Sequence, residues 1–312
     1  MLFRASAPGS LMLMGEHAVL EGHHALVCAI DKRMTVIVSP RSDKEITITS
    51  ALGYLETNLT NLTITLPFQF VCAVLIFFKK HLRNGCDIKI ESEFSSTIGF
   101  ASSSAVTVAL LSALSMWCDV PYSEVNLMHH ARKIIRSVQG LGSGADVAAC
   151  VMGGMVAYRM RPFYAEKLAM LYPISVVYSG YKTPTVDVVK QVTQRFSQNK
   201  KLYQHICRAI NTCVLEGIHA VKKSDWKQFG LIMNTQQGLM DALGVNSPRL
   251  ADIVDQLREQ PDILGAKISG SGLGDCVLGL GNVSSASMSF STQDIRQIPV
   301  EMTSKGVYCE KI

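Results

Sequence analysis

The stretch GFASSSAVTVALL, residues 99–111, passes from a glycine through three consecutive serines directly into an apolar segment. Val106, Leu110 and Leu111 recur at helical spacing, which predicts a helix that begins near Ser102. The serines have two interpretations. They are either an N-cap with its solvated loop, or hydroxyl and backbone N–H groups that hold a phosphate at a helix N-terminus.

The composition is that of a globular protein with a substantial core. The chain has 312 residues, of which 48% are hydrophobic and 18% charged, enough for two domains that share a cleft. The net charge of +5 comes from scattered short pairs such as Lys79-Lys80, without a dense basic tract. We therefore expect no nucleic-acid partner.

Cysteine usage and apolar runs bear on the compartment. Nine cysteines occur without a C-x-x-C pair, which disfavours a disulfide framework and a zinc site and suits a reducing environment. The N-terminal MLFRASAPGS lacks the apolar core of a signal peptide. The most apolar run, FVCAVLIFF at 70–78, is too short to span a bilayer. We expect a cytoplasmic protein with no membrane partner, and the sequence leaves its oligomeric state open, a homodimer included.

Strand and helix patterns are mixed along the chain, which favours the α+β class. Alternating or β-branched runs predict strands within 34–50 (broken at Ser39-Pro40), 62–66, 87–92, 153–160 and 171–180. Apolar residues at helical spacing predict helices at 67–82, from 102, at 125–138, and near 185–197, 200–222 and 225–242. A domain division is expected at about 155–170.

Four segments concentrate small residues between apolar elements, at 6–22, 99–111, 139–154 and 267–281. Glycine allows close approach of the backbone to a ligand, and successive amides in such turns form anion-binding concavities. Taken singly, each segment also has a structural interpretation. Asp146 would be an N-cap, and the segment 267–281 a tight turn between two buried strands.

Taken together and in this order, the segments resemble the motifs of the GHMP kinase superfamily, named for galacto-, homoserine, mevalonate and phosphomevalonate kinases. GEHAVLEG is similar to the N-terminal motif of mevalonate kinases, and GFASSSAVTVALLSAL to the family's phosphate loop. SGSGLGDCVLGL is similar to the third motif, and SGYKTPTVDVV to a segment that places a threonine near the substrate. The resemblance covers nearly the whole chain.

The resemblance implies a two-domain fold with ATP in the cleft between the domains. Residues 1–165 would form an N-terminal domain like domain 2 of ribosomal protein S5, which carries the phosphate loop and the catalytic aspartate. Residues 166–312 would form a ferredoxin-like C-terminal domain. With ATP and Mg²⁺ as cofactors, the protein would be a small-molecule kinase of the mevalonate (isoprenoid) pathway.

The motifs favour different acceptors of the phosphoryl group. The first motif favours the hydroxyl of mevalonate, whereas VQGLGSGADVAACVMGG is closer to phosphomevalonate kinases, which act on 5-phosphomevalonate. A catalytically weakened relative that only binds nucleotide or isoprenoid is a third alternative. Diphosphomevalonate decarboxylase is disfavoured, because its lysine- and tryptophan-containing continuation is absent after Pro8.

The motif positions assign roles to individual residues by resemblance. Asp146 matches the catalytic aspartate, which accepts or orients the proton of the acceptor hydroxyl. Ser10 occupies the position of the catalytic lysine in A-P-G-K. The ATP phosphates would be held by Gly99, Ala101, Ser102, Ser103 and Ser104, with the Ser103 hydroxyl also reaching Mg²⁺. The acceptor substrate would be bound by Glu16, His17, Thr185, Gly270, Ser271 and Gly272.

Two departures from the family pattern concern charge. Ser10 cannot supply the positive charge of the family's lysine. Mevalonate kinases also carry a glutamate upstream of the aspartate that helps to hold Mg²⁺, but no carboxylate occurs here between Glu124 and Asp146, and the corresponding region is Ile135-Arg136. Lys182 is one candidate for a replacement cation, and its other interpretation is a solvated loop lysine.

Overall fold

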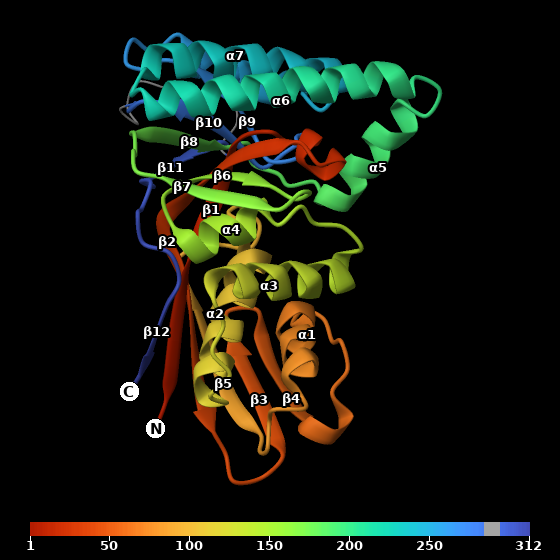
Figure 1. Cartoon of the computed structure of the whole chain (residues 1–312), viewed down its shortest axis with the longest axis vertical. Helices are drawn as coiled ribbons and strands as arrows, with labels where there is room; N and C mark the ends of the chain where they lie inside the picture. Colours follow the sequence, from red (N-terminus) through yellow and green to blue (C-terminus); the bar gives the residue numbers. More distant parts are fainter. Residues whose placement is uncertain (284–293) are drawn as a thin grey trace.

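The computed structural model describes residues 1–283 and 294–312, and it is built on two β-sheets (Figure 1). Within these residues the first sheet has eight strands, with a main path in the order β12-β1-β2-β5-β3-β4 and with β6 paired to β2 and β7. The strands are β1 (Phe3–Met14), β2 (His24–Pro40), β3 (Glu45–Ser50), β4 (Gly53–Asn58), β5 (Cys86–Ser92), β6 (Met155–Arg159), β7 (Tyr164–Leu168) and β12 (Tyr308–Lys311).

Helices cover one face of the first sheet. They are α1 (Gln69–Phe78), α2 (Ser102–Trp117), α3 (Glu124–Gln139) and α4 (Ala145–Met152), with short 3₁₀ turns η1 (Ala18–Glu21) and η2 (Leu59–Asn61). Both α2 and α4 pack on β1 and β2, while α3 packs outside them. Residues 104–111 of α2 are therefore buried on every side, which explains why this helix is apolar around its whole circumference.

The second sheet has the order β11-β8-β10-β9 within the described residues. Its strands are β8 (Ile174–Tyr178), β9 (Ala266–Ser269), β10 (Cys276–Leu280) and β11 (Arg296–Ile298). Its helices are α5 (Thr185–Arg195), α6 (Lys200–Lys222), α7 (Trp226–Leu243) and α8 (Pro248–Arg258). The long helices α6 and α7 lie side by side at the top of Figure 1, and α6 also contacts β1 and β2, which ties the two sheets together.

Most of the predicted elements are confirmed, and one strand prediction is wrong. The α+β class, the helices near 185–197, 200–222 and 225–242, and the turn between two buried strands at 267–281 agree with the structure. Residues 62–66 form no strand, although their pattern alternates. The segment pairs with no strand of either sheet among the described residues, and an alternating pattern forms a strand only where a neighbouring strand pairs with it. Ile64 and Leu66 are consequently exposed.

The predicted domain division at residue 165 stays a prediction. Two strands beyond or across that point belong to the first sheet, because β7 pairs with β6 and β12 returns to pair with β1. The two chain ends accordingly lie beside each other in Figure 1. No helix in the described part of the chain is long and apolar enough to cross a membrane.

Candidate active site

A cleft of about 540 Å³ opens where the two sheets meet. Strand β1, the N-terminal turns of α2 and α4, the inner face of α3, and the loops before α5 and after β9 all contribute to its lining. The sequence-predicted residues that line it are Ser10, Glu16, His17, Gly99, Ala101, Ser102, Ser103, Ser104, Asp146, Thr185, Gly270 and Ser271. Gly272 is not among them, since its backbone packs behind the cleft against Val245.

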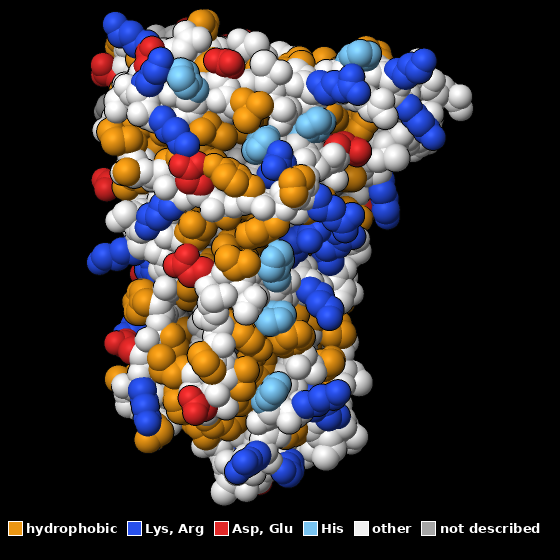
Figure 2. Space-filling model, in the orientation of Figure 1, with side chains coloured by type: hydrophobic (Ala, Val, Ile, Leu, Met, Phe, Trp, Pro, Cys, Tyr) orange, Lys and Arg blue, Asp and Glu red, His pale blue; other side chains and the backbone are white. Residues whose placement is uncertain are grey.

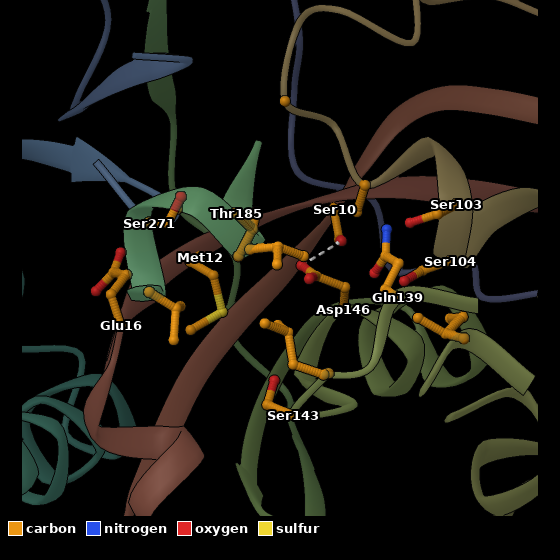
Figure 3. A pocket seen from close by; sticks show the side chains of 18 of the residues that line it. Ser10, Met12, Glu16, Ser103, Ser104, Gln139, Ser143, Asp146, Thr185 and Ser271 are labelled. Carbon is orange, nitrogen blue, oxygen red and sulfur yellow. Dashed lines mark hydrogen bonds between the residues drawn. The ribbon is translucent and has the colours of Figure 1, made fainter. Parts of the chain in front are cut away.

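Ser10 and Asp146 lie at the centre of the cleft. The Ser10 hydroxyl donates a hydrogen bond to Asp146 Oδ1 at 3.0 Å (Figure 3). A register shift in β1 between Pro8 and Ser10 brings this hydroxyl under the first turn of α4. The N-cap of α4 is Gly144, at φ +92°, so the N-cap interpretation of Asp146 does not hold. Its carboxylate is instead turned toward β1.

The charge state of Asp146 is set by opposing effects. Burial raises the pKa of its carboxyl group above the ordinary value, and the hydrogen bond from Ser10 opposes this shift. Among nearby charges, Glu16 raises the pKa and Lys182 lowers it. A carboxylate with a raised pKa is a stronger base, which suits it to accept the proton of a bound hydroxyl.

The loop before α2 presents backbone groups to the cleft. No side chain caps the helix, and its N-cap residue is Ala101 in the left-handed conformation, at φ +53°. The serine run is therefore not an N-cap, and the first N–H groups of α2 together with the helix dipole favour an anion there. Ser102 and Ser103 are partly exposed to the cleft, whereas Ser104 is buried.

Glu16, at the other end of the cleft, belongs to a buried charged group. Its Oε1 forms an ion pair with Lys267, and its Oε2 accepts a hydrogen bond from Gln236 Nε2 at 2.6 Å. Lys267 is fully buried, and this burial lowers its pKa while Glu16 raises it. No role was predicted from the sequence for Lys267 or Gln236. The signal available in the sequence was a lysine inside the apolar strand β9, because a lysine that is buried needs a charged or hydrogen-bonding partner.

His17 follows Glu16 and contacts the loop after β9. It is buried, it has a left-handed backbone at φ +61°, and its Nε2 lies 2.8 Å from the carbonyl oxygen of Ser271. Burial lowers the pKa of His17, so the neutral ring donates from Nε2 and leaves Nδ1 as an acceptor. The Ser271 hydroxyl is buried and has no hydrogen-bond partner among the described residues.

Lys182 reaches the cleft. It lies on the loop before α5, its ammonium group donates to the carbonyl oxygen of Ser96 at 2.9 Å, and it lines the cavity beside Thr185. Its side chain is exposed, yet its charge lowers the pKa of two cleft carboxylates, Asp146 and Asp275. Lys182 is therefore a cation of the site as well as a loop lysine.

The cleft carboxylates come from three separate elements. They are Glu16, Asp146 and Asp275. Helix α3 lines the cleft without a carboxylate, since it contributes the uncharged Ile135 and Gln139 and the cation Arg132. In the part of the chain that the structure describes, no group of three or more His, Cys, Asp or Glu side chains could by itself hold a metal ion. Any cation at this site would therefore need ligands from the bound substrate as well.

Figure 3 shows how the labelled side chains are arranged along the cleft. Ser103 and Ser104 lie on one side of the Ser10–Asp146 pair, and Glu16 and Ser271 lie on the other. A ligand that spans the cleft would therefore have its middle against Asp146. On the outer surface, Figure 2 shows Lys and Arg side chains distributed among neutral and hydrophobic ones, gathered most densely at mid-height.

Three family models match the chain. The GHMP kinases N-terminal domain matches residues 69–154, and the GHMP kinases C-terminal domain matches residues 218–287. The galactokinase galactose-binding signature matches residues 3–40. These matches contain the loop before α2, the Asp146 segment and the β1 segment that line the cleft.

Curated relatives and solved structures agree with these matches. Mevalonate kinase from Aeropyrum pernix is 32% identical over 89% of this chain and 88% of the relative. Mevalonate kinase from Pyrococcus furiosus is 30% identical over 88% of each. The crystal structure of mevalonate kinase from Methanococcus jannaschii superposes with a TM-score of 0.80 at 22% identity, over 97% of this chain and 98% of that structure.

Proposed function

Because this chain belongs to the GHMP kinases, and is thus a phosphotransferase, we propose that it transfers the γ-phosphate of ATP to the hydroxyl of mevalonate. The curated relatives at 30% identity or more over most of the chain bear the name mevalonate kinase, which supports this acceptor. The observation that carries the proposal is the Ser10–Asp146 pair, which lies between a backbone anion site and a second polar end of the cleft.

The phosphates of ATP would bind at the N-terminus of α2. Phosphoryl transfer needs positioning and charge stabilisation more than covalent help. Backbone N–H groups around Ala101 and Ser102 supply that stabilisation without a full charge. Mg²⁺ fits this site, because it is commonly bound by one or two carboxylates together with substrate phosphates. Ser103 and a cleft carboxylate would hold it, and when bound it would neutralise the developing charge on the phosphates.

Asp146 would act on the acceptor. The attacking hydroxyl loses its proton to the Asp146 carboxylate as the new oxygen–phosphorus bond forms, and ADP leaves with the electrons of the broken bond. The Ser10 hydroxyl keeps one carboxylate oxygen oriented by its hydrogen bond. Asp146 Oδ2 is then the oxygen that receives the proton.

Lys182 would supply the positive charge that Ser10 lacks. It lines the cleft and its charge acts on Asp146, so it favours the ionised base and the negative charge of the transferring group. We expect Lys182→Met to lower kcat and to raise the apparent pKa of the pH–rate profile, because an attractive charge is lost. Lys190→Met, on an exposed position of α5, is the matched control. An unchanged profile in Lys182→Met would contradict this role.

The acceptor end suits a small anion with hydroxyl groups. Lys267 compensates the charge of Glu16, so the buried group does not repel a carboxylate substrate. His17 Nδ1 and the unpartnered Ser271 hydroxyl would hydrogen-bond the substrate's polar groups. These contacts would orient the reacting hydroxyl toward Asp146.

The proposal is tested by ADP release. Purified protein with MgATP is incubated with mevalonate, and ADP is measured by a coupled assay against a reaction without acceptor. We expect ADP to form in proportion to added mevalonate. ADP formation that depends on 5-phosphomevalonate alone would support the alternative acceptor, and tight ATP binding by calorimetry without any transfer would support the weakened relative.

A further inference from the structure

Asp275 is a cleft carboxylate to which the mechanism above assigns no individual role. It lies between β9 and β10 with a left-handed backbone at φ +63°, and only 6% of its surface is exposed. Its backbone N–H donates to Tyr181 and its carbonyl accepts from Ser179, both at 2.9 Å. Aspartate adopts a left-handed conformation more readily than most residues but less readily than glycine, so these contacts hold some backbone strain at this point.

The carboxyl group of Asp275 lies against the phosphate loop. A Cβ atom placed on Gly99 would be 2.9 Å from Asp275 Cβ and 3.0 Å from its carboxyl carbon. Only glycine therefore lets the loop pass so close to the carboxylate. The sequence thus accommodates an acidic group directly beside the backbone that would hold the phosphates of ATP.

One oxygen of Asp275 has no partner in the protein. Oδ1 is buried without a hydrogen-bond partner among the described residues, although the residue lines the cleft. An unsatisfied buried carboxylate oxygen is costly, and burial raises the pKa of Asp275 to about 6, against the opposing effect of Lys182. Such a group is expected to have a ligand that the protein alone does not supply.

A bare carboxylate beside a triphosphate would weaken binding by repulsion, whereas a cation between the two would bind both. Helix α3 supplies no carboxylate to the cleft, so a cation there has few other protein ligands. We propose that Asp275 is a carboxylate ligand of the Mg²⁺ that accompanies ATP, in place of the carboxylate that α3 lacks. This inference rests on the proposed function only in its use of ATP, and does not depend on the acceptor.

The test measures metal and nucleotide binding without any acceptor. Mn²⁺ replaces Mg²⁺ because free Mn²⁺ is quantified by electron paramagnetic resonance, and a non-hydrolysable ATP analogue fills the nucleotide site. The variants are Asp275→Asn and Asp275→Gly, the second of which also removes the backbone strain and so protects folding. Asp252→Asn, exposed on α8, is the control.

We expect both Asp275 variants to weaken Mn²⁺ binding to the protein–nucleotide complex by at least about tenfold. With the metal chelated, they should bind the analogue as tightly as the unmodified protein or more tightly, because a repulsive charge is gone. Asp252→Asn should change neither quantity.

Unchanged Mn²⁺ affinity in both variants would overturn the proposal and leave the kinase function standing. Equal loss of nucleotide affinity with and without metal would also overturn it, since Asp275 would then act on the nucleotide or the loop alone. Failure of the unmodified protein to bind the analogue at all would overturn both the inference and the proposed function.

Discussion

The two ends of the cleft differ in the groups that line them. At the α2 end, a glycine, an alanine and small serines leave the backbone N–H groups to do the binding. At the opposite end, Glu16, Lys267 and Gln236 form a buried group in which each charge depends on its partner. Asp146 lies between these ends and accepts a hydrogen bond from Ser10 on β1.

This difference determines where substitutions are tolerated. A backbone site needs only small side chains and the right dihedral angles, so the small residues Ala101 and Ser104 are accommodated there. A buried ion pair needs both members, because removing one leaves an unpaired charge away from water. We therefore expect substitutions at Asp146 and at the Glu16–Lys267 pair to cost the most activity or stability, and substitutions at the α2 end to cost the least.

Asp146→Asn should have the largest effect on activity. Asparagine keeps the size and an acceptor oxygen for Ser10 but cannot take a proton, so kcat should fall by about a hundredfold to ten-thousandfold. Steady-state kinetics with ATP and mevalonate measure this. Asp187→Asn, exposed in the first turn of α5, is the control. If the two variants turned over equally fast, Asp146 would not be the base.

Lys267→Met should have the largest effect on stability. It leaves the Glu16 carboxylate buried and unpaired, at a cost of about 3–5 kcal/mol in the free energy of unfolding. Adding Glu16→Gln should recover most of this loss, because the remaining charge is removed. Denaturant unfolding measures both variants, with exposed Lys227→Met as control. A double variant no more stable than Lys267→Met would show that the two charges are not coupled.

His17 should make stability depend on pH. Its pKa is lowered by burial in the folded protein and is 6.5 otherwise, so the unfolded chain binds the proton more readily. Stability is therefore lost as pH falls below 6.5, by at most about 1.4 kcal/mol per pH unit for one proton. His17→Gln keeps a donor for Ser271 but does not titrate, so its unfolding free energy should fall less between neutral and mildly acidic pH. Parallel curves for both proteins would mean that His17 is not the group responsible.

Ala101→Gly should have the smallest effect, and in the stabilising direction. Relief of a left-handed alanine is worth roughly 1–2 kcal/mol, partly offset by the freedom of glycine in the unfolded chain, for a net gain of about 0.5–1 kcal/mol. Thermal unfolding measures this gain. Ala109→Gly, inside α2, should destabilise by about 1 kcal/mol or more. A loss of stability in Ala101→Gly would show that the left-handed Ala101 at the α2 end is not strained.

Local patterns predicted most of the fold and the centre of the site. Helical spacing located α5, α6 and α7, and the order of small-residue segments pointed to the loop before α2 and to Asp146, both of which line the cleft. Segment 62–66 was misassigned because strand formation depends on a pairing partner, and among the described residues this segment pairs with no strand of either sheet. Strand β4 itself is largely polar and contains no buried residue, so its own sequence carries little strand signal.

The charged partners could not be predicted because they are distant along the chain. Lys267 and Glu16 are 251 positions apart and meet only when β9 lies beside β1. Asp275 comes to Gly99 in the same way, through the packing of one sheet against the loop of the other domain. Lys182 was a candidate cation from the sequence, and only the folded loop brings it to the cleft.

This cleft is proposed to join the γ-phosphate of ATP to the hydroxyl of mevalonate. Competition between the two acceptors tests this directly: limiting MgATP is mixed with equal amounts of isotopically labelled mevalonate and unlabelled 5-phosphomevalonate, and the products are identified by mass spectrometry. We predict that labelled phosphomevalonate is formed from mevalonate, with one ADP per product, and that Asp146→Asn forms it at least about a hundredfold more slowly. Formation of the diphosphate from 5-phosphomevalonate, with mevalonate unconsumed, would contradict the account.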